Sequence, residues 1–532
     1  MDFRDLIASL NTPIIQPEGI IIISLLITLF LDLLSQKPIS WLPWIPVGGL
    51  ILSLGSLGIR FNEVTSINQD FFNNQTIAFL GSFQGDAISI IFRFFMSLSG
   101  ILCILLSLEY IEKTRTALIE FLILFVTATL GAMFLVGTND LVTLFVALET
   151  LGLSSYLLTG YMKRDMRSNE AALKYLLIGA LSSSFLLYGI SWLYALSGGH
   201  LELNYILANF IATDFNSSLY LPLILITVGI AFKLSAAPFH QWTPDVYQGS
   251  PTPIVAFLSV GSKAAGLALA TRVLAIIFPY LNLQVHILFE ILAVLSMILG
   301  NLIAITQTSL KRMLGYSSVG QAGFLMIGLI TGFQDGYSSM LLYLFIYILM
   351  NLGAFACVIL FGLRTGTDQI KDYSGLYKKD PLLAICLTVC LLSLGGIPPL
   401  AGFFGKLYLF WAGWQSGFYL LVFVGLTVSV ISIYYYLRVI KLMFIKEYQA
   451  MSLCIQNYGV NTVTQEDFSQ ATLTGKNTFS LTLIQPIELC ISLCVFGSIF
   501  VGLASSPLIE LIQKAIFYTP YIQAPISLST NF

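Results

Sequence analysis

Long apolar runs separated by short polar connectors fill almost the whole chain. A helix needs about 20 predominantly apolar residues to cross the hydrocarbon core of a bilayer, and counting such runs predicts about fourteen spans. The predicted ranges are 19–35, 41–60, 87–109, 117–136, 140–161, 170–197, 220–239, 252–278, 285–306, 311–331, 337–363, 381–412, 418–445 and 483–505. Because proline removes a backbone donor, we expect two of these helices to be broken, one at Pro238 and one at Pro398 and Pro399. The pattern therefore predicts an all-α polytopic membrane protein.

Composition agrees with this prediction. Of the 532 residues, 57% are hydrophobic and only 10% are charged, whereas soluble domains carry about 25% charged residues. A net charge of −2 gives no reason to expect nucleic acid as a partner. The seven cysteines show no metal-binding spacing, and no glycine-rich phosphate loop or histidine pair is present, so we expect no metal and no redox cofactor on this chain. The first apolar run lacks the flanks of a signal peptide and is predicted to be a retained span.

The basic residues sort to one side of the membrane if the spans alternate in direction. The positive-inside rule then places both termini in a lumen or periplasm and the basic loops in the cytoplasm or stroma. The basic side receives Lys37, Lys113, Arg115, Lys163, Arg164, Arg167, Lys311, Arg312, the range 364–379 and the range 441–476, and the other side keeps Arg4, Arg60 and Lys514. The longest polar connectors are 61–84, 198–219 and 447–481, and the second contains a candidate amphipathic surface helix.

Several ionisable residues fall inside the predicted spans: Glu149, Lys174, Lys233, Lys263 and Lys406. A charge at membrane depth is costly and is tolerated mainly where it faces a protein interior or a water-filled path. Lys233, Lys263 and Lys406 have apolar residues on both sides, which favours a proton path. For Lys174 two interpretations stay open, a relay residue or a lysine held in an ion pair or at the headgroups.

The proposed relay starts with Glu149 and Lys233 as a pair, because a carboxylate close to a buried lysine controls whether the lysine takes up or releases a proton. Lys263 would pass the proton along the midplane, and Lys406 would connect to the far exit. His240 follows the first helix break directly. It is either part of this path or a hydrogen-bonded anchor.

The two broken spans are five spans apart, which suggests an internal repeat. A unit of five spans is odd, so its second copy must run through the membrane in the opposite direction. The predicted organisation is 1–115 for three N-terminal helices, 116–280 and 281–447 for two inverted five-helix repeats, and 448–532 for a loop, the last helix and a tail.

Several long motifs resemble a known family. FKLSAAPFHQWTPDVYQGSPTP, SLKRMLGYSSVGQAGF and GGIPPLAGFFGKLYLFW resemble the antiporter-like membrane subunits of respiratory complex I, which are similar to Mrp-type cation/proton antiporters. ETLGLSSYLLTGYMKRDMRSNEAALKYLL and LFGLRTGTDQIKDYSGLYKKDPLLA look like subunit 2 of the NAD(P)H dehydrogenase-like complex of cyanobacteria and chloroplasts. The resemblance covers about residues 15–505.

This resemblance implies fourteen helices with two inverted five-helix repeats and two broken helices. It places the family's functional charges on Glu149 in the fifth helix, Lys233 in the seventh, Lys263 in the eighth and Lys406 in the twelfth. It also implies that sister subunits pass electrons from ferredoxin or NAD(P)H through iron–sulfur clusters to plastoquinone. This chain would couple that reaction to proton pumping across the thylakoid membrane.

Two alternatives from other classes remain at the level of the sequence. One is an Mrp-like cation/proton antiporter subunit that works without a redox partner. The other is a structural membrane subunit whose buried charges are inert.

Overall fold

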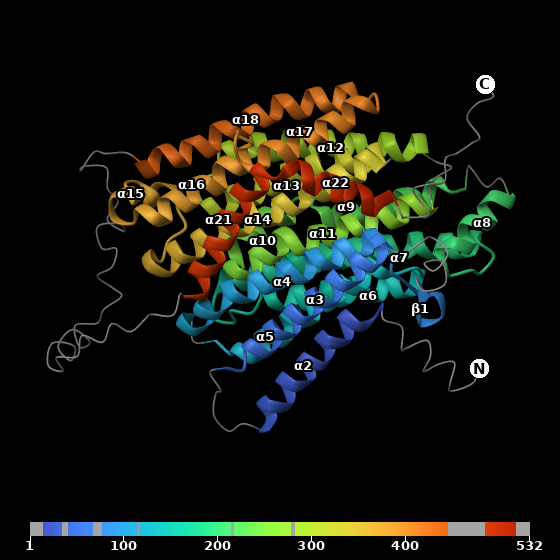
Figure 1. Ribbon diagram of the computed structural model, residues 1–532, viewed down its shortest axis with the longest axis horizontal. Helices are drawn as coiled ribbons and strands as arrows, with labels where there is room; N and C mark the ends of the chain where they lie inside the picture. Colours follow the sequence, from blue (N-terminus) through green and yellow to red (C-terminus); the bar gives the residue numbers. More distant parts are fainter. Residues whose placement is uncertain are drawn as a thin grey trace.

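The computed structural model describes residues 14–34, 41–66, 77–114, 116–213, 218–277, 282–332, 334–444 and 485–517, and it forms a bundle of long helices (Figure 1). Twelve of these helices are long and apolar enough to cross a membrane. The long helices are α2 (Gln16–Leu34), α3 (Trp44–Ser66), α4 (Ala87–Thr114), α5 (Leu118–Gly137), α6 (Leu141–Thr159), α7 (Met166–Leu196), α11 (Thr252–Ile277), α12 (Asn282–Ile305), α13 (Leu310–Thr331), α14 (Gln334–Thr365), α18 (Tyr419–Phe444) and α21 (Pro486–Leu503).

The two remaining predicted spans are broken helices, as expected. The first consists of α9 (Tyr220–Leu234) and α10 (Trp242–Gly249), and the second of α16 (Pro381–Gly395) and α17 (Ala401–Gln415). All of the predicted spans therefore coincide with a long helix or with one of these two pairs.

The residues that end the first halves differ from the prediction. α9 ends at Leu234, before Pro238, because Ser235 adopts a left-handed conformation with φ 58°. α16 ends at Gly395 in the same way, with Gly396 at φ 79°. A left-handed residue turns the chain so that the following N–H groups bond carbonyls of the last helical turn, which closes the helix. The prolines follow these caps and lie inside the two interruptions, so the breaks occur where they were predicted, with left-handed residues closing the first halves.

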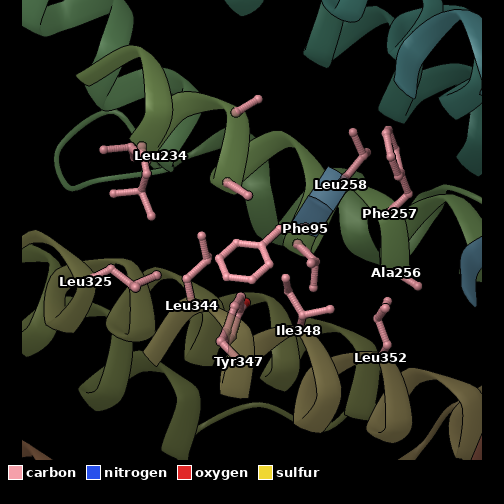
Figure 2. Close-up of a cluster of buried hydrophobic side chains, with 14 of the residues drawn as sticks. Phe95, Leu234, Ala256, Phe257, Leu258, Leu325, Leu344, Tyr347, Ile348 and Leu352 are labelled. Atoms are coloured by element: carbon pink, nitrogen blue, oxygen red, sulfur yellow. The ribbon is translucent and has the colours of Figure 1, made fainter. Parts of the chain in front are cut away.

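The core lies in the middle of the bundle, where α11, α13 and α14 are almost fully enclosed by other helices (Figure 1). Figure 2 shows how Phe95 from α4 and Tyr347 from α14 meet in the space between α11 and α14, while Phe257 extends from the other side of α11 and packs against Phe125 of α5. The peripheral helices α2, α7 and α18 expose large apolar side chains instead, such as Phe423, which is 67% exposed. An apolar exterior around a close-packed interior is the arrangement expected of a membrane-embedded bundle.

Several short elements complete the described structure. They are β1 (Ile77–Ala78) paired antiparallel with β2 (Phe83–Gln84), η1 (Phe79–Gly81), α8 (Leu203–Thr213), η3 (Ile370–Tyr373), α15 (Leu376–Lys379) and α22 (Ser505–Phe517). α8 confirms the predicted helix in the connector 198–219. α15, within a basic connector, lies at the end of the bundle opposite to α8 and β1 (Figure 1).

α22 was not predicted; it packs against α14, and Gln513 Nε2 donates to Asp335 Oδ1 at 3.0 Å. Some predictions fall outside the described residues. These are the connector 447–481, residues 67–76 of the connector 61–84, and the basic residues Arg4, Lys37, Arg115 and Lys476.

The broken helix occupies the fourth place in each of the two predicted five-span units. The first unit runs from α5 to α11 and the second from α12 to α18. This order is compatible with the predicted inverted repeats and with boundaries near 116–280 and 281–447, which stay predictions.

Candidate functional site

Lys233 lies in the last turn of α9 and is buried, with 7% of its surface exposed. Its ammonium lies against α6, 5.9 Å from the centre of the Tyr156 ring. It also lies beside Gly152, where a Cβ atom would be only 3.4 Å from Nζ. Gly152 therefore leaves room for the lysine head group one turn beyond Glu149.

Glu149 lies in the same region as Lys233, one turn before Gly152 on α6. Its carboxylate is close enough for an electrostatic effect on the Lys233 ammonium, but among the described residues the two form no direct ion pair. The Glu149 Oε1 atom is buried and has no hydrogen-bond partner within the described part of the chain. The two groups thus lie in one region without the direct contact that a fixed salt bridge requires.

Lys263 lies in the middle of α11 and is 1% exposed. Its Nζ donates a hydrogen bond of 2.5 Å to the backbone carbonyl of Ser318 on α13. α11 packs against α9 here, since a Cβ on Gly266 would lie 3.3 Å from Cβ of Lys233. The first two lysines therefore belong to neighbouring helices.

Lys406 lies in the second turn of α17 and is 5% exposed. Its Nζ donates to the carbonyls of Leu394 at 3.0 Å and Gly395 at 3.2 Å, and it lies 5.0 Å from the centre of the Phe324 ring. Both carbonyls belong to the end of α16, where the helix stops and its last carbonyls lose their intrahelical partners. The negative end of the helix dipole also favours a cation at this position.

Different donors thus bind the carbonyls at the two helix breaks. At the end of α9, the carbonyl of Phe232 accepts the N–H of Ser235 at 3.0 Å and the indole N–H of Trp242 at 3.3 Å, so Lys233 is free to face α6. At the end of α16, Lys406 itself bonds the exposed carbonyls. The lysine that precedes the first break thus faces a neighbouring helix, whereas the lysine that follows the second break binds the helix end itself.

The contacts of Lys174 favour the ion-pair interpretation. Its side chain is 43% exposed, and Nζ lies 2.7 Å from Glu170 and 3.1 Å from Asp245. Arg312 reaches the other oxygen of Asp245 at 3.2 Å. These residues line a polar cavity of about 310 Å³ between α7, α10 and α13. Lys174 falls inside the span, as predicted, in the third turn of α7, and of the two interpretations left open its contacts favour the ion pair.

His240 lies in the turn between α9 and α10 and is half-buried. Its Nδ1 atom is buried without a hydrogen-bond partner among the described residues, and its ring centre lies 6.4 Å from that of Tyr316. Both interpretations of His240, a residue of the proton path and a hydrogen-bonded anchor, stay predictions.

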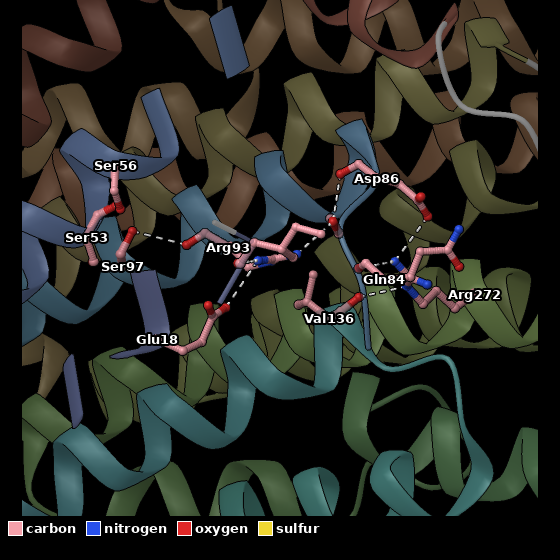
Figure 3. Close-up of polar contacts among 11 residues, drawn as sticks. Glu18, Ser53, Ser56, Gln84, Asp86, Arg93, Ser97, Val136 and Arg272 are labelled. Carbon is pink, nitrogen blue, oxygen red and sulfur yellow. Dashed lines mark hydrogen bonds and ion pairs between the residues drawn. The ribbon is translucent and has the colours of Figure 1, made fainter. Parts of the chain in front are cut away.

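Sequence reasoning missed two buried ion pairs, one within the N-terminal helices and one between the start of α4 and α11 of the first five-span unit (Figure 3). Arg93 on α4 pairs with Glu18 on α2 at 3.3 Å, with 1% and 0% of the side chains exposed. Arg272 on α11 pairs with Asp86 at 3.2 Å, with 9% exposed on each side. Both arginines stand inside apolar runs, so the criterion applied to the lysines could have found them.

Asp86 precedes α4 directly and is the ion-pair partner of Arg272. Burial raises the pKa of its carboxyl, and the guanidinium groups of Arg272 and Arg93 act in the opposite direction. Arg272 also donates to the carbonyls of Val136 at 2.7 Å and Gln84 at 3.2 Å. These bonds connect α11 to the end of α5 and to the β-hairpin.

Together these features define a polytopic membrane protein with a series of buried lysines next to two broken helices, the class to which proton- and cation-translocating subunits belong. Residues 138–432 match the family described as NADH:quinone oxidoreductase/Mrp antiporter, TM, and residues 4–109 match NAD(P)H-quinone oxidoreductase subunit 2 N-terminal. The chain belongs to the NAD(P)H-quinone oxidoreductase subunit 2 family.

Similar proteins agree over almost the full length. The chain is 61% identical over 526 residues to the chloroplastic NAD(P)H-quinone oxidoreductase subunit 2 of Chlorokybus atmophyticus, covering 98% of both chains. It is 54% identical over 530 residues to NAD(P)H-quinone oxidoreductase subunit 2 of Microcystis aeruginosa, again with 98% of both chains covered. Among solved structures, a chain of respiratory complex I from Thermus thermophilus with bound Aureothin matches with a TM-score of 0.72 and 30% identity, covering 93% of this chain and 98% of that chain.

Proposed function

We propose that this chain translocates protons as a membrane subunit of an NAD(P)H-quinone oxidoreductase complex, and that Lys233, Lys263 and Lys406 carry the protons. The observation that carries the proposal is the burial of three lysines in the centre of the bundle, where carbonyls and aromatic rings are their close neighbours. Removing a charge from water costs several kcal/mol. A lysine in such a site is therefore sensitive to any change in the charges around it.

Glu149 supplies the adjustable charge at one end of the series. When its carboxylate approaches Lys233, it stabilises the ammonium form, and when it withdraws, the proton is released. A cation at Lys233 disfavours a second cation at the neighbouring Lys263. Alternating occupancy would thus drive the proton towards Lys406 and the far exit.

The chemistry of electron transfer belongs to sister subunits in this proposal. Electrons would pass from ferredoxin or NAD(P)H through iron–sulfur clusters to plastoquinone, and this chain would respond to that reaction. The names of the chloroplast and cyanobacterial relatives and the apolar exterior support a multi-pass protein of the thylakoid membrane. The charge sorting in the sequence supports termini on the lumenal side.

The test is Lys406→Met in the intact complex, with proton uptake and quinone reduction measured in the same membranes. Loss of a proton-transfer group typically lowers a rate by about a hundredfold, so we expect proton pumping to fall by that order. Lys379→Met is the matched control, because Lys379 is an exposed lysine of α15, and this variant should pump normally.

The outcome distinguishes the competing functions. Normal pumping by Lys406→Met would refute the proposed path. Sodium-dependent proton exchange by the chain without quinone reduction would instead favour an Mrp-like antiporter, the second function that the matched family covers.

A further inference from the structure

α13 lies between the second and third lysines and contacts both of their sites. Ser318 accepts the hydrogen bond from Lys263, and Phe324 presents its ring to Lys406. At a rise of about 1.5 Å per residue, these positions lie about 9 Å apart along the helix. Gln321 stands midway, three residues from each, so it is a neighbour of both positions on the helix surface.

Gln321 is 2% exposed and makes two hydrogen bonds at the site of Lys406. Its Nε2 donates to the carbonyl of Leu394 at 3.3 Å, the same carbonyl that accepts from Lys406 at 3.0 Å. Its Oε1 accepts a hydrogen bond from the hydroxyl of Tyr343 on α14. The glutamine therefore connects α13 and α14 to the broken end of α16.

These partners determine the orientation of the amide. A carbonyl oxygen can only accept, so the side of Gln321 that faces Leu394 must be the NH₂ group. Oε1 then faces Tyr343, whose O–H must donate. The two bonds fix the glutamine in one orientation, and reversing the amide would place two acceptors against each other.

A third polar group reaches the same place from α18. The hydroxyl of Tyr436 lies beside Gln321 and Ser317 without completing a hydrogen bond to a described residue. Tyr343 and Tyr436 are 0% and 1% exposed. Buried hydroxyls, which can both donate and accept, thus gather around Gln321 between the two lysines.

We propose that Gln321 is a positioning residue for proton transfer between Lys263 and Lys406, with Tyr343 holding its amide in the required orientation. The inference rests on the proposed function. By bonding the Leu394 carbonyl independently of the lysine, Gln321 keeps that acceptor in place when Lys406 gives up its proton. The site then needs no rearrangement before the next proton arrives, which is how preorganised dipoles assist charge transfer.

The experiment compares Gln321→Met and Tyr343→Phe in the intact complex in its own membranes. Turnover per assembled complex is measured by quinone reduction in H₂O and in D₂O. If a misplaced acceptor slows the proton step, turnover of Gln321→Met falls about tenfold, and the solvent isotope effect rises because that step becomes rate-limiting. Tyr343→Phe should change both quantities in the same direction but less.

Tyr337→Phe is the matched control, since Tyr337 is also a buried tyrosine of α14 but is not a partner of Gln321. A merely structural role would lower the amount of complex and leave the isotope effect unchanged, and that result would overturn the inference. If Gln321→Met fails to assemble, Tyr343→Phe becomes the test of the inference. An unchanged isotope effect in Tyr343→Phe would likewise overturn the inference. If Lys406→Met abolishes pumping while both variants behave as wild type, the inference fails and the proposed function stands.

Discussion

Replacing Arg93 by methionine should strongly weaken the attachment of α2 to the rest of the bundle. The guanidinium pairs with Glu18 at 3.3 Å and donates to the Ile14 carbonyl at 3.0 Å and to Ser89 Oγ at 3.1 Å. Because both charged side chains are buried, the substitution leaves the Glu18 carboxylate without its counter-ion. Breaking one side of a buried ion pair costs about 3–5 kcal/mol.

Because α2 lies at the periphery of the bundle, its attachment depends strongly on this ion pair. The helix presents apolar residues such as Phe30 and Leu33, 62% and 76% exposed, to the surroundings of the bundle. Lipid tails are as apolar as these side chains, so burial of apolar surface gives little drive for helix association in a membrane. The polar contacts of Arg93 therefore carry a large share of the attachment energy.

The assay is the fraction of intact complex that survives a series of heating steps in mild detergent. Arg93→Met should lower the midpoint temperature clearly, and the double variant Glu18→Leu/Arg93→Met should recover most of the loss, since replacing both partners by apolar groups is often neutral. Arg60→Met is the control. Its pair with Glu63 is 23% and 43% exposed, and exposed pairs contribute about 0–1 kcal/mol. A midpoint for Arg93→Met equal to that of the wild type, or a double variant weaker than the single one, would refute the reasoning.

Two further predictions concern other contacts. Asp245→Asn removes the shared acceptor of Lys174 and Arg312. Because this cluster is half-exposed, the stability of the complex should fall by only about 1 kcal/mol. Normal pumping by the variant would confirm a structural role for Lys174, whereas a pumping defect would make Lys174 part of the proton path. Gly402→Ala should prevent assembly, because a Cβ there would lie 1.7 Å from a backbone oxygen of α16. The control Gly48→Ala should assemble normally, because nothing lies within 4 Å of its Cβ. Native gels of membrane extracts measure the assembly of both variants.

The role of the α16 break follows from the combination of two ordinary features. A helix that stops inside a protein leaves carbonyls without intrahelical partners, and a lysine inside a membrane protein needs acceptors. At Lys406 the unpaired carbonyls at the end of α16 accept the hydrogen bonds of the lysine, so both requirements are met by the same contacts. Gln321 adds a donor that does not change its charge, so the arrangement can persist through both protonation states of the lysine.

The order of spans, the two breaks and the candidate lysines could all be predicted from the sequence. These features depend on neighbouring residues alone: a run of about 20 apolar residues crosses the bilayer wherever the rest of the chain lies. A lysine such as Lys263 within such a run is costly in any arrangement that faces lipid. The same reasoning would have selected Arg93 and Arg272, had arginines been considered with the lysines.

The partners of these charges were decided by the tertiary structure. Lys263 meets Ser318 across 55 residues, and Gln321 meets Leu394 across 73. Such pairs arise from which helices pack together and at what rotation, and an apolar run contains little information on either. For the same reason Lys174 could not be assigned until Asp245, on another helix, was seen beside it. Hydropathy determines that a helix enters the membrane, but only packing against its neighbours determines which side chain each buried charge will face.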